Sequence, residues 1–174
     1  MKLTDFASKR GFNERELDQW GIRVDGETII IPTVGRNGPW YERTHRPEGV
    51  PKYESPKGVE SHLYNPLGLG PHSREVWIAE GEFDTLSLVT VGAPALGILG
   101  VSSFREVWAL LFKKARIVLA LDPDEAGRAR ADKMAQLWTG PGQVSVFDPT
   151  PYGDLNDWFK ADRAGFRREV LEHE

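Results

Sequence analysis

From Glu75 onward, short apolar runs rich in β-branched residues alternate with longer stretches of helical character, and this alternation limits the possible folds of the 174-residue chain most strongly. Strands joined through helices run parallel and are buried on both faces. The expected strands cover residues 76–79, 95–99, 116–121 and 143–147, and the expected helices cover residues 82–91, 103–113, 125–138, 154–160 and 163–173. We therefore predict an α/β fold with a parallel sheet flanked by helices over residues 75–174.

The chain before Glu75 has a different pattern. Two short helices are expected near residues 4–10 and 13–20, followed by a hairpin whose strands cover residues 27–32 and 40–44. Residues 47–74 are rich in Pro, Gly and charge, which is typical of an irregular connector with short strands. Residues 1–74 are thus predicted to form a small α+β lobe. Its net charge is +1, against −5 for residues 75–174.

Acidic residues gather where two of the predicted parallel strands end. Glu80 and Asp84 follow the first strand, and Asp122 and Asp124 follow the strand at 116–121. In open parallel sheets, functional groups collect beyond the carboxyl ends of the strands, so these acids are expected to face one small volume if their strands are neighbours. Each motif alone also fits an ordinary helix N-cap. The pair is harder to explain in that way, because Glu80 has no capping role at a strand end.

A divalent cation would explain the crowding of these acids. Two carboxylates about 4 Å apart repel by ~1 kcal/mol in water and by ~4 kcal/mol at an effective dielectric constant of about 20. All-oxygen ligation is what Mg²⁺ prefers, and Mn²⁺ can substitute for it. The chain has no cysteine, and its four histidines lack zinc-site spacing, so a structural zinc site is not expected.

The sequence contains no signal for a membrane segment. The first ten residues contain charges where a signal peptide would need an apolar core, and no apolar run approaches the ~20 residues that a membrane span requires. A soluble, cytoplasmic protein is expected.

Residues 75–160 resemble a Toprim domain, the acidic fold shared by bacterial-type primases, topoisomerases and some nucleases. The resemblance lies in an E-G-x-x-D motif at Glu80–Asp84, in Leu96-Gly-Ile-Leu-Gly100, and in a D-x-D-x-A-G motif from Asp122 to Gly127. It implies a metal-binding role for Glu80, Asp84, Asp122 and Asp124, of which Glu80, Asp122 and Asp124 would be catalytic.

The stretch before Glu75 is similar to the basic lobe of bacterial and phage primases. The likeness rests on Ile29–Pro32, on a turn at Gly38, and on the motifs Pro51-Lys-Tyr53 and Leu63-Tyr-Asn65 in that order. The family likeness implies that four residues of the lobe face a template or a nucleoside triphosphate: Arg43, Arg46, Lys52 and Tyr53. Arg and Lys neutralise phosphates and Tyr can stack on a base. Ordinary surface charge on a hairpin is the alternative.

A third acidic segment begins at Gly153. Primases have a lysine, an aspartate and a further acidic pair at this place, whereas here Gly153 replaces the lysine and Asn156 replaces the second acid. Asp154 is expected to be an additional metal ligand, with a helix N-cap as the alternative.

The resemblance favours the catalytic core of a DNA primase of phage or mobile-element type, which would join ribonucleotides from NTPs on a single-stranded DNA template with Mg²⁺. A zinc-binding module and a replicative helicase would be separate partners. Two alternatives stay open: a Toprim nuclease that cleaves phosphodiesters, and a non-catalytic nucleic-acid-binding accessory. The altered Gly153 and Asn156 positions favour the accessory, whereas intact Glu80, Asp122 and Asp124 oppose it.

Overall fold

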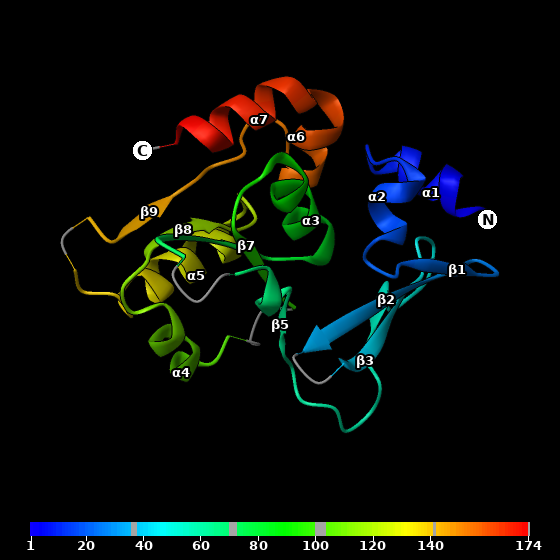
Figure 1. Ribbon diagram of the computed structural model, residues 1–174, viewed down its shortest axis with the longest axis horizontal. Coiled ribbons are helices and arrows are strands. Elements are labelled where there is room, and N and C mark those ends of the chain that lie inside the picture. Colours follow the sequence, from blue (N-terminus) through cyan, green and yellow to red (C-terminus); the bar gives the residue numbers. More distant parts are fainter. Residues whose placement is uncertain (36–37, 70–72, 100–103, 141, 174) are drawn as a thin grey trace. The chain divides into compact units, whose positions relative to one another are not determined.

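The computed structural model describes residues 1–35, 38–69, 73–99, 104–140 and 142–173. These residues form two compact units, Met1–Ser61 and His62–Glu174, and each unit has its own sheet (Figure 1). Residues 36–37 of the turn expected between Gly35 and Gly38 lie outside the described residues, and so does residue 103, where a helix is expected to start.

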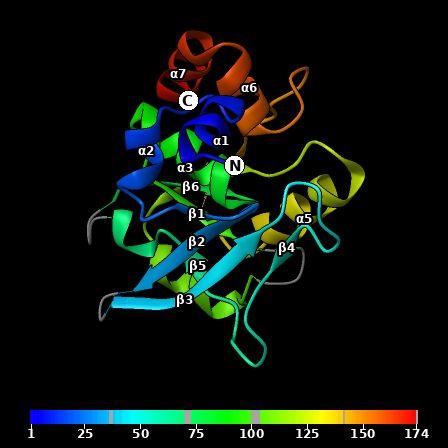
Figure 2. The ribbon, with the colours of Figure 1, turned by 90° about the vertical axis from the view of Figure 1, so that its right-hand side faces the viewer.

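The first unit consists of two short helices and an antiparallel sheet (Figure 2). Its elements are α1 Leu3–Lys9, α2 Glu14–Asp18, β1 Arg23–Asp25, β2 Thr28–Gly35, β3 Gly38–His45 and β4 Tyr53–Glu54, with the strands in the order β1-β2-β3-β4. Asn13 starts α2 with a capping box, accepting a hydrogen bond from the Glu16 amide. Along β2, Ile29 and Ile31 are fully buried, which is the period of two expected for a strand with one face in the core.

The second unit is an α/β domain, as the sequence predicts, and its sheet has a fifth strand, β5, in addition to the four expected ones. Its strands are β5 Leu63–Tyr64, β6 Glu75–Ala79, β7 Ala95–Ile98, β8 Arg116–Ala120 and β9 Val144–Val146, in the order β5-β7-β6-β8-β9. All neighbouring pairs are parallel except β5 with β7. β5 pairs with β7, and the second compact unit begins at His62.

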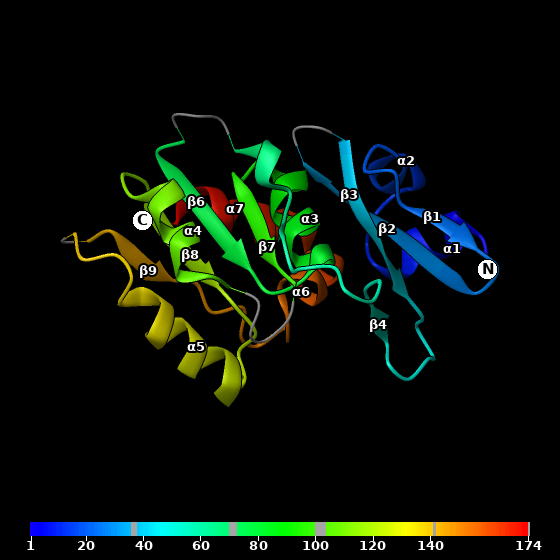
Figure 3. The same cartoon turned by 90° about the horizontal axis from the view of Figure 1, so that it is seen from below.

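Helices cover both faces of this sheet (Figure 3). One face packs against α4 Glu106–Ala109 and α5 Glu125–Ala135, and the other against α3 Glu82–Val91, α6 Leu155–Ala161 and α7 Arg163–Glu172. Short 3₁₀ turns cover Pro66–Gly68 (η1) and Leu110–Phe112 (η2). The side chains of β6 and β8 are buried on both faces, which explains why these strands read as unbroken apolar runs in the sequence.

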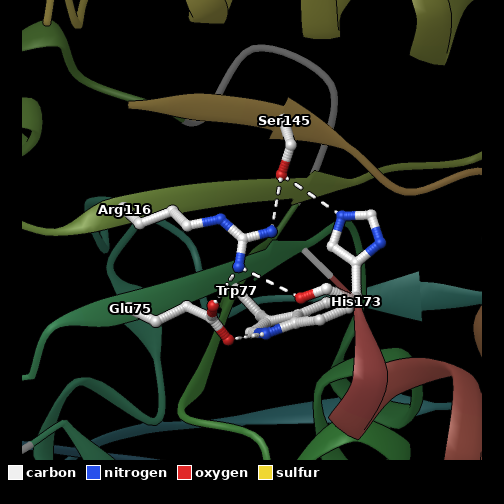
Figure 4. A network of polar contacts seen from close by, with 5 residues as sticks. All are labelled: Glu75, Trp77, Arg116, Ser145 and His173. Carbon is white, nitrogen blue, oxygen red and sulfur yellow. Dashed lines mark hydrogen bonds and ion pairs between the residues drawn. The ribbon is translucent and has the colours of Figure 1, made fainter. Parts of the chain in front are cut away.

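A polar network fastens the C-terminal segment to the amino ends of the central strands (Figure 4). Arg116 at the start of β8 forms an ion pair with Glu75 at 2.7 Å and donates to the carbonyl oxygen of His173 at 3.1 Å. Trp77 Nε1 donates to Glu75, and the Oγ of Ser145 lies 3.2 Å from Nε2 of His173. Because His173 directly follows α7, these contacts help to hold the helix in place. The network lies at the end of the sheet opposite to the acidic motifs.

None of the helices in the described part of the chain has the length and apolarity that a membrane crossing requires.

Candidate functional site

Strand order and register bring the two acidic motifs to one edge of the sheet. β6 and β8 are hydrogen-bonded neighbours, with Ala79 opposite Ala120. Glu80 directly follows β6, and Asp122 lies two residues beyond the end of β8. Because both strands run in the same direction, their carboxyl ends place these acids side by side.

The electrostatics of Asp122 reflect this convergence. Burial, and then the negative charges of Glu80, Asp154 and Asp124, raise the pKa of Asp122 from 3.8 to about 6, whereas Arg130 acts in the opposite direction. Carboxylates from three separate segments therefore lie close enough to Asp122 to act on it electrostatically. We call Glu80, Asp122, Asp124 and Asp154 the acidic cluster.

Glu80 is held by an ion pair with a helix on the other side of the cluster. Its Oε1 lies 2.5 Å from Nη1 of Arg130 in α5, and the two side chains are only 17% and 10% exposed. The second oxygen of Glu80, Oε2, is buried and has no hydrogen-bond partner among the described residues. A buried carboxylate oxygen without a donor is costly, so Glu80 retains capacity for a further ligand.

Asp124 positions the start of α5. Its Oδ1 accepts a hydrogen bond of 2.6 Å from the Gly127 amide, which is an N-cap. A Cβ atom at Gly127 would lie 2.0 Å from the carbonyl oxygen of Asp122, so only glycine lets the helix approach the Asp122 backbone this closely. The spacing of the D-x-D-x-A-G motif is thus explained by backbone packing as well as by the carboxylates.

The third acidic segment joins the cluster through α6. Asp154 caps this helix by accepting from the Asp157 amide at 2.7 Å, and it acts electrostatically on Asp122. Asp84 lies on α3, where its Oδ1 accepts from the amide of Asn156 at 3.0 Å. In this arrangement Asp84 ties α3 to α6.

Asn156 is a structural residue that the sequence reasoning treated only as a missing acid. It is 2% exposed, and its Nδ2 donates to the Oγ of Ser87 at 3.0 Å. A buried amide with several partners stabilises the contact between α6 and α3. The apolar residues that flank it, Leu155 and Phe159, are buried, and this periodicity is the signal in the sequence that would have placed Asn156 in the interior.

The donor set fits a hard divalent cation by its chemistry. It consists of carboxylate oxygens, and the orphaned Oε2 of Glu80 is available for another ligand. No group of three or more acidic, His or Cys side chains in the described ranges is arranged to hold a metal ion. Instead, Oε1 of Glu80 contacts Arg130, and the Oδ1 atoms of Asp124 and Asp154 accept hydrogen bonds from helix amides.

The four basic-lobe positions lie together on the first unit. Tyr53 on β4 stacks on His45 of β3 with ring centroids 4.3 Å apart, and the guanidinium of Arg43 lies 5.2 Å from the Tyr53 ring. The Arg46 amide donates to the Lys52 carbonyl at 2.8 Å, and the Arg46 guanidinium pairs with Glu54 at 2.8 Å.

His45 lies beneath this basic surface and is fully buried. Desolvation, and then the positive charges of Arg10 and Lys52, lower its pKa from 6.5 to about 4. His45 is therefore a neutral core residue that supports the stacked Tyr53.

Comparison with known proteins identifies the class of the second unit. Residues 77–159 match a protein-family model described as Toprim-like. This segment contains the acidic cluster and residues of strands β6, β7, β8 and β9, which pair in parallel, and it is similar to a Toprim-like domain.

A curated relative comes from a phage. The Gene 57 protein of Mycobacterium phage D29 is 34% identical over 90 residues, which cover 51% of this chain. The match spans 59% of that relative's length.

Solved structures with a similar fold are primases. The primase fragment of the bacteriophage T7 primase-helicase protein has a TM-score of 0.75 at 20% identity, covering 94% of this chain and 72% of that one. The DnaG catalytic core has a TM-score of 0.73 at 18% identity, covering 95% and 71%. The DnaG primase catalytic domain bound to ssDNA has a TM-score of 0.72 at 16% identity, covering 97% and 70%. The chain thus has the fold of primase catalytic cores.

Proposed function

We propose that this protein is the catalytic core of a phage-type DNA primase, which joins ribonucleotides on a single-stranded DNA template. The observation that carries the proposal is the acidic cluster at the carboxyl ends of β6 and β8, within a Toprim-like domain. The primase fold of the similar structures and the phage origin of the curated relative support it.

In this proposal the acidic cluster holds Mg²⁺, for which Mn²⁺ can substitute. The bound ion would stabilise negative charge on the triphosphate and on the attacking and leaving oxygens. Glu80, Asp122 and Asp124 would be its ligands, and Asp154 would be an additional one. Asp84, which accepts from the Asn156 amide, would keep α6 and thus Asp154 in place.

The basic surface of the first unit would bind the nucleic acid or the triphosphate. Arg43, Arg46 and Lys52 supply positive charge for phosphates, and Tyr53 supplies a ring for base stacking. The ion pair of Arg46 with Glu54 is exposed, so exchanging its partner for a phosphate has a low energetic cost. A separate zinc-binding module and a replicative helicase are the protein partners that we propose.

An oligoribonucleotide synthesis assay tests this function. The protein is incubated with single-stranded DNA, NTPs and Mg²⁺ or Mn²⁺, in the presence and absence of a candidate zinc-module partner, and products are resolved on a sequencing gel. We expect synthesis by the wild type, and a loss of at least about a hundredfold in Asp122→Asn and Asp124→Asn. Asn retains the ability to cap a helix, so Asp124→Asn is expected to stay folded.

Asp132→Asn is the matched control, since Asp132 is an exposed acid of the same helix outside the acidic cluster. Its activity should equal that of the wild type. Strand cleavage without synthesis would show a Toprim nuclease instead. The absence of both activities, even with the partner, would show a non-catalytic accessory protein.

A further inference from the structure

Arg130 is a buried cation that the proposed function does not use. It lies on α5, six residues after Asp124, and its side chain is 10% exposed. Arginine is rarely buried unless it is paired, and its partner here is Glu80 at 2.5 Å. The contact links the proposed metal ligand at the end of β6 to a helix that follows β8.

The position of Arg130 compensates the charge of the acidic cluster. The negative charges of Glu80, Asp154 and Asp124 each oppose the ionisation of Asp122. Arg130 acts on Asp122 with the opposite sign and contacts Glu80 directly. The fold thus contains a positive charge at the place where such a cluster needs one.

A neighbouring arginine on the same helix shows that this placement is specific. Arg128 is exposed, and its guanidinium donates to the carbonyl oxygen of Pro123 at the start of the helix. Arg128 forms no ion pair with the acidic cluster in the part of the chain that the structure describes. Two arginines of one helix therefore differ in burial and in partner, and only Arg130 contacts a cluster carboxylate.

We propose that Arg130 is the built-in counter-cation of the metal-free site, and that a divalent cation must displace it from Glu80 in order to bind. The inference rests on the proposed metal site. Glu80 offers one oxygen to Arg130, while Oε2 is buried without a hydrogen-bond partner. An ion that approaches Oε2 comes close to the guanidinium, and the two positive charges repel each other.

This exchange has two consequences. The apoprotein keeps its carboxylates together without metal, because Arg130 offsets part of their repulsion. Metal affinity is lower than the number of carboxylates implies, because binding includes the cost of moving Arg130. Removal of Arg130 should therefore weaken the metal-free fold and strengthen metal binding, whereas loss of a ligand weakens metal binding and loss of a mere structural support weakens both.

Metal binding without nucleotide or DNA tests the proposal directly. Free Mn²⁺ is measured by electron paramagnetic resonance in titrations of the full chain, comparing Arg130→Met with the wild type. We expect Arg130→Met to bind Mn²⁺ about tenfold more tightly. In thermal unfolding, Arg130→Met should have a lower midpoint than the wild type in EDTA, and the deficit should shrink at saturating Mg²⁺.

Arg128→Met is the matched control, because it removes the same charge from the same helix without touching Glu80. Its Mn²⁺ affinity should change by less than about twofold. Arg130→Lys keeps the charge and should bind Mn²⁺ like the wild type. If Arg130→Met does not fold in EDTA, Arg130→Gln replaces it, because Gln keeps a donor for Glu80 without the charge.

Unchanged or weaker Mn²⁺ binding by a folded Arg130→Met or Arg130→Gln protein would overturn the proposal. Glu80→Gln and Asp122→Asn separate this outcome from failure of the proposed function. If both bind Mn²⁺ like the wild type, the acidic cluster is no metal site and the proposed function fails as well. If both lose Mn²⁺ binding while Arg130→Met binds like the wild type, only the role of Arg130 is rejected.

Discussion

Asp122 and His45 are both shielded from water, but the charges around them have opposite signs. Asp122 lies among other carboxylates, whereas His45 lies among Arg and Lys side chains. In both cases the charged form is disfavoured by desolvation first and by like charges second. Each residue therefore makes the stability of the protein depend on pH in a direction that can be worked out.

The raised pKa of Asp122 predicts that its ionisation destabilises the metal-free protein. Below pH 3.8 the acid is protonated in the folded and the unfolded chain, and its contribution to stability is lost as pH rises through about 6. Asp122→Asn should therefore increase the free energy of unfolding in EDTA at pH 7 by about 1–3 kcal/mol. Urea unfolding at pH 4 and pH 7 measures this, and an equal or lower stability of the variant at pH 7 would contradict it.

The lowered pKa of His45 predicts loss of stability in acid. The unfolded chain binds a proton near pH 6.5, but the folded chain binds it only near pH 4, so stability falls as pH drops between these values. The loss is at most about 3 kcal/mol. The imidazole resonances of His45, assigned with a His45→Gln variant, should titrate near pH 4 in the folded protein. A midpoint near 6.5 would show that the ring is accessible to water.

At the scale of elements, α6 is the piece whose role differs most from expectation. Sequence reasoning treated Gly153 and Asn156 as replacements of family residues, which favour a non-catalytic accessory. In the structure, Asn156 instead joins α6 to α3 through Asp84 and Ser87, while Asp154 caps the helix beside the acidic cluster. The start of α6 thus places Asp154 in the acidic cluster. The buried contact between α6 and α3 is made by Asn156, which carries no charge.

Asn156→Asp should consequently destabilise the protein. A carboxylate at this buried position would lose the donor to Ser87 and add a negative charge next to Asp84. We expect a loss of about 2–4 kcal/mol at pH 7, and a smaller loss at pH 4, where the acid is protonated. Urea unfolding monitored by tryptophan fluorescence measures it, with the exposed Asp157→Asn as the control. A loss that is independent of pH would point to packing rather than charge.

At the scale of the whole molecule, the two compact units have separate sheets. The strands of the second sheet all come from residues 62–174, and those of the first from residues 1–61. The acidic cluster lies in the second unit and the basic surface in the first. The proposed functions of metal binding and of template binding are therefore assigned to different units.

A fragment of residues 62–174 should fold by itself and bind Mn²⁺ with an affinity within about twofold of the full chain, while its affinity for single-stranded DNA decreases. Circular dichroism melting and Mn²⁺ titration check the first two expectations, and fluorescence anisotropy with a labelled oligonucleotide checks the third. A fragment of about 60 residues buries only ~60% of its surface, so residues 1–61 alone should be marginally stable. An unfolded 62–174 fragment would show that its core depends on the first unit.

The sequence by itself determined the types of elements and the chemistry at the strand ends. Local periodicity identified the buried strands near residues 76–79 and 116–121, because a strand with two covered faces reads as an unbroken apolar run. Spacing and residue type identified the acidic motifs, because a turn from strand to helix needs glycine and caps at fixed positions.

Only the tertiary structure decided which elements are neighbours. The order β5-β7-β6-β8-β9 places β6 beside β8, and that adjacency joins Glu80 to Asp122. The same holds for the pairing of Arg130 with Glu80 and for the burial of His45. Such contacts join residues far apart in the chain, and local propensity and periodicity carry no information about them, because they depend on how whole elements pack.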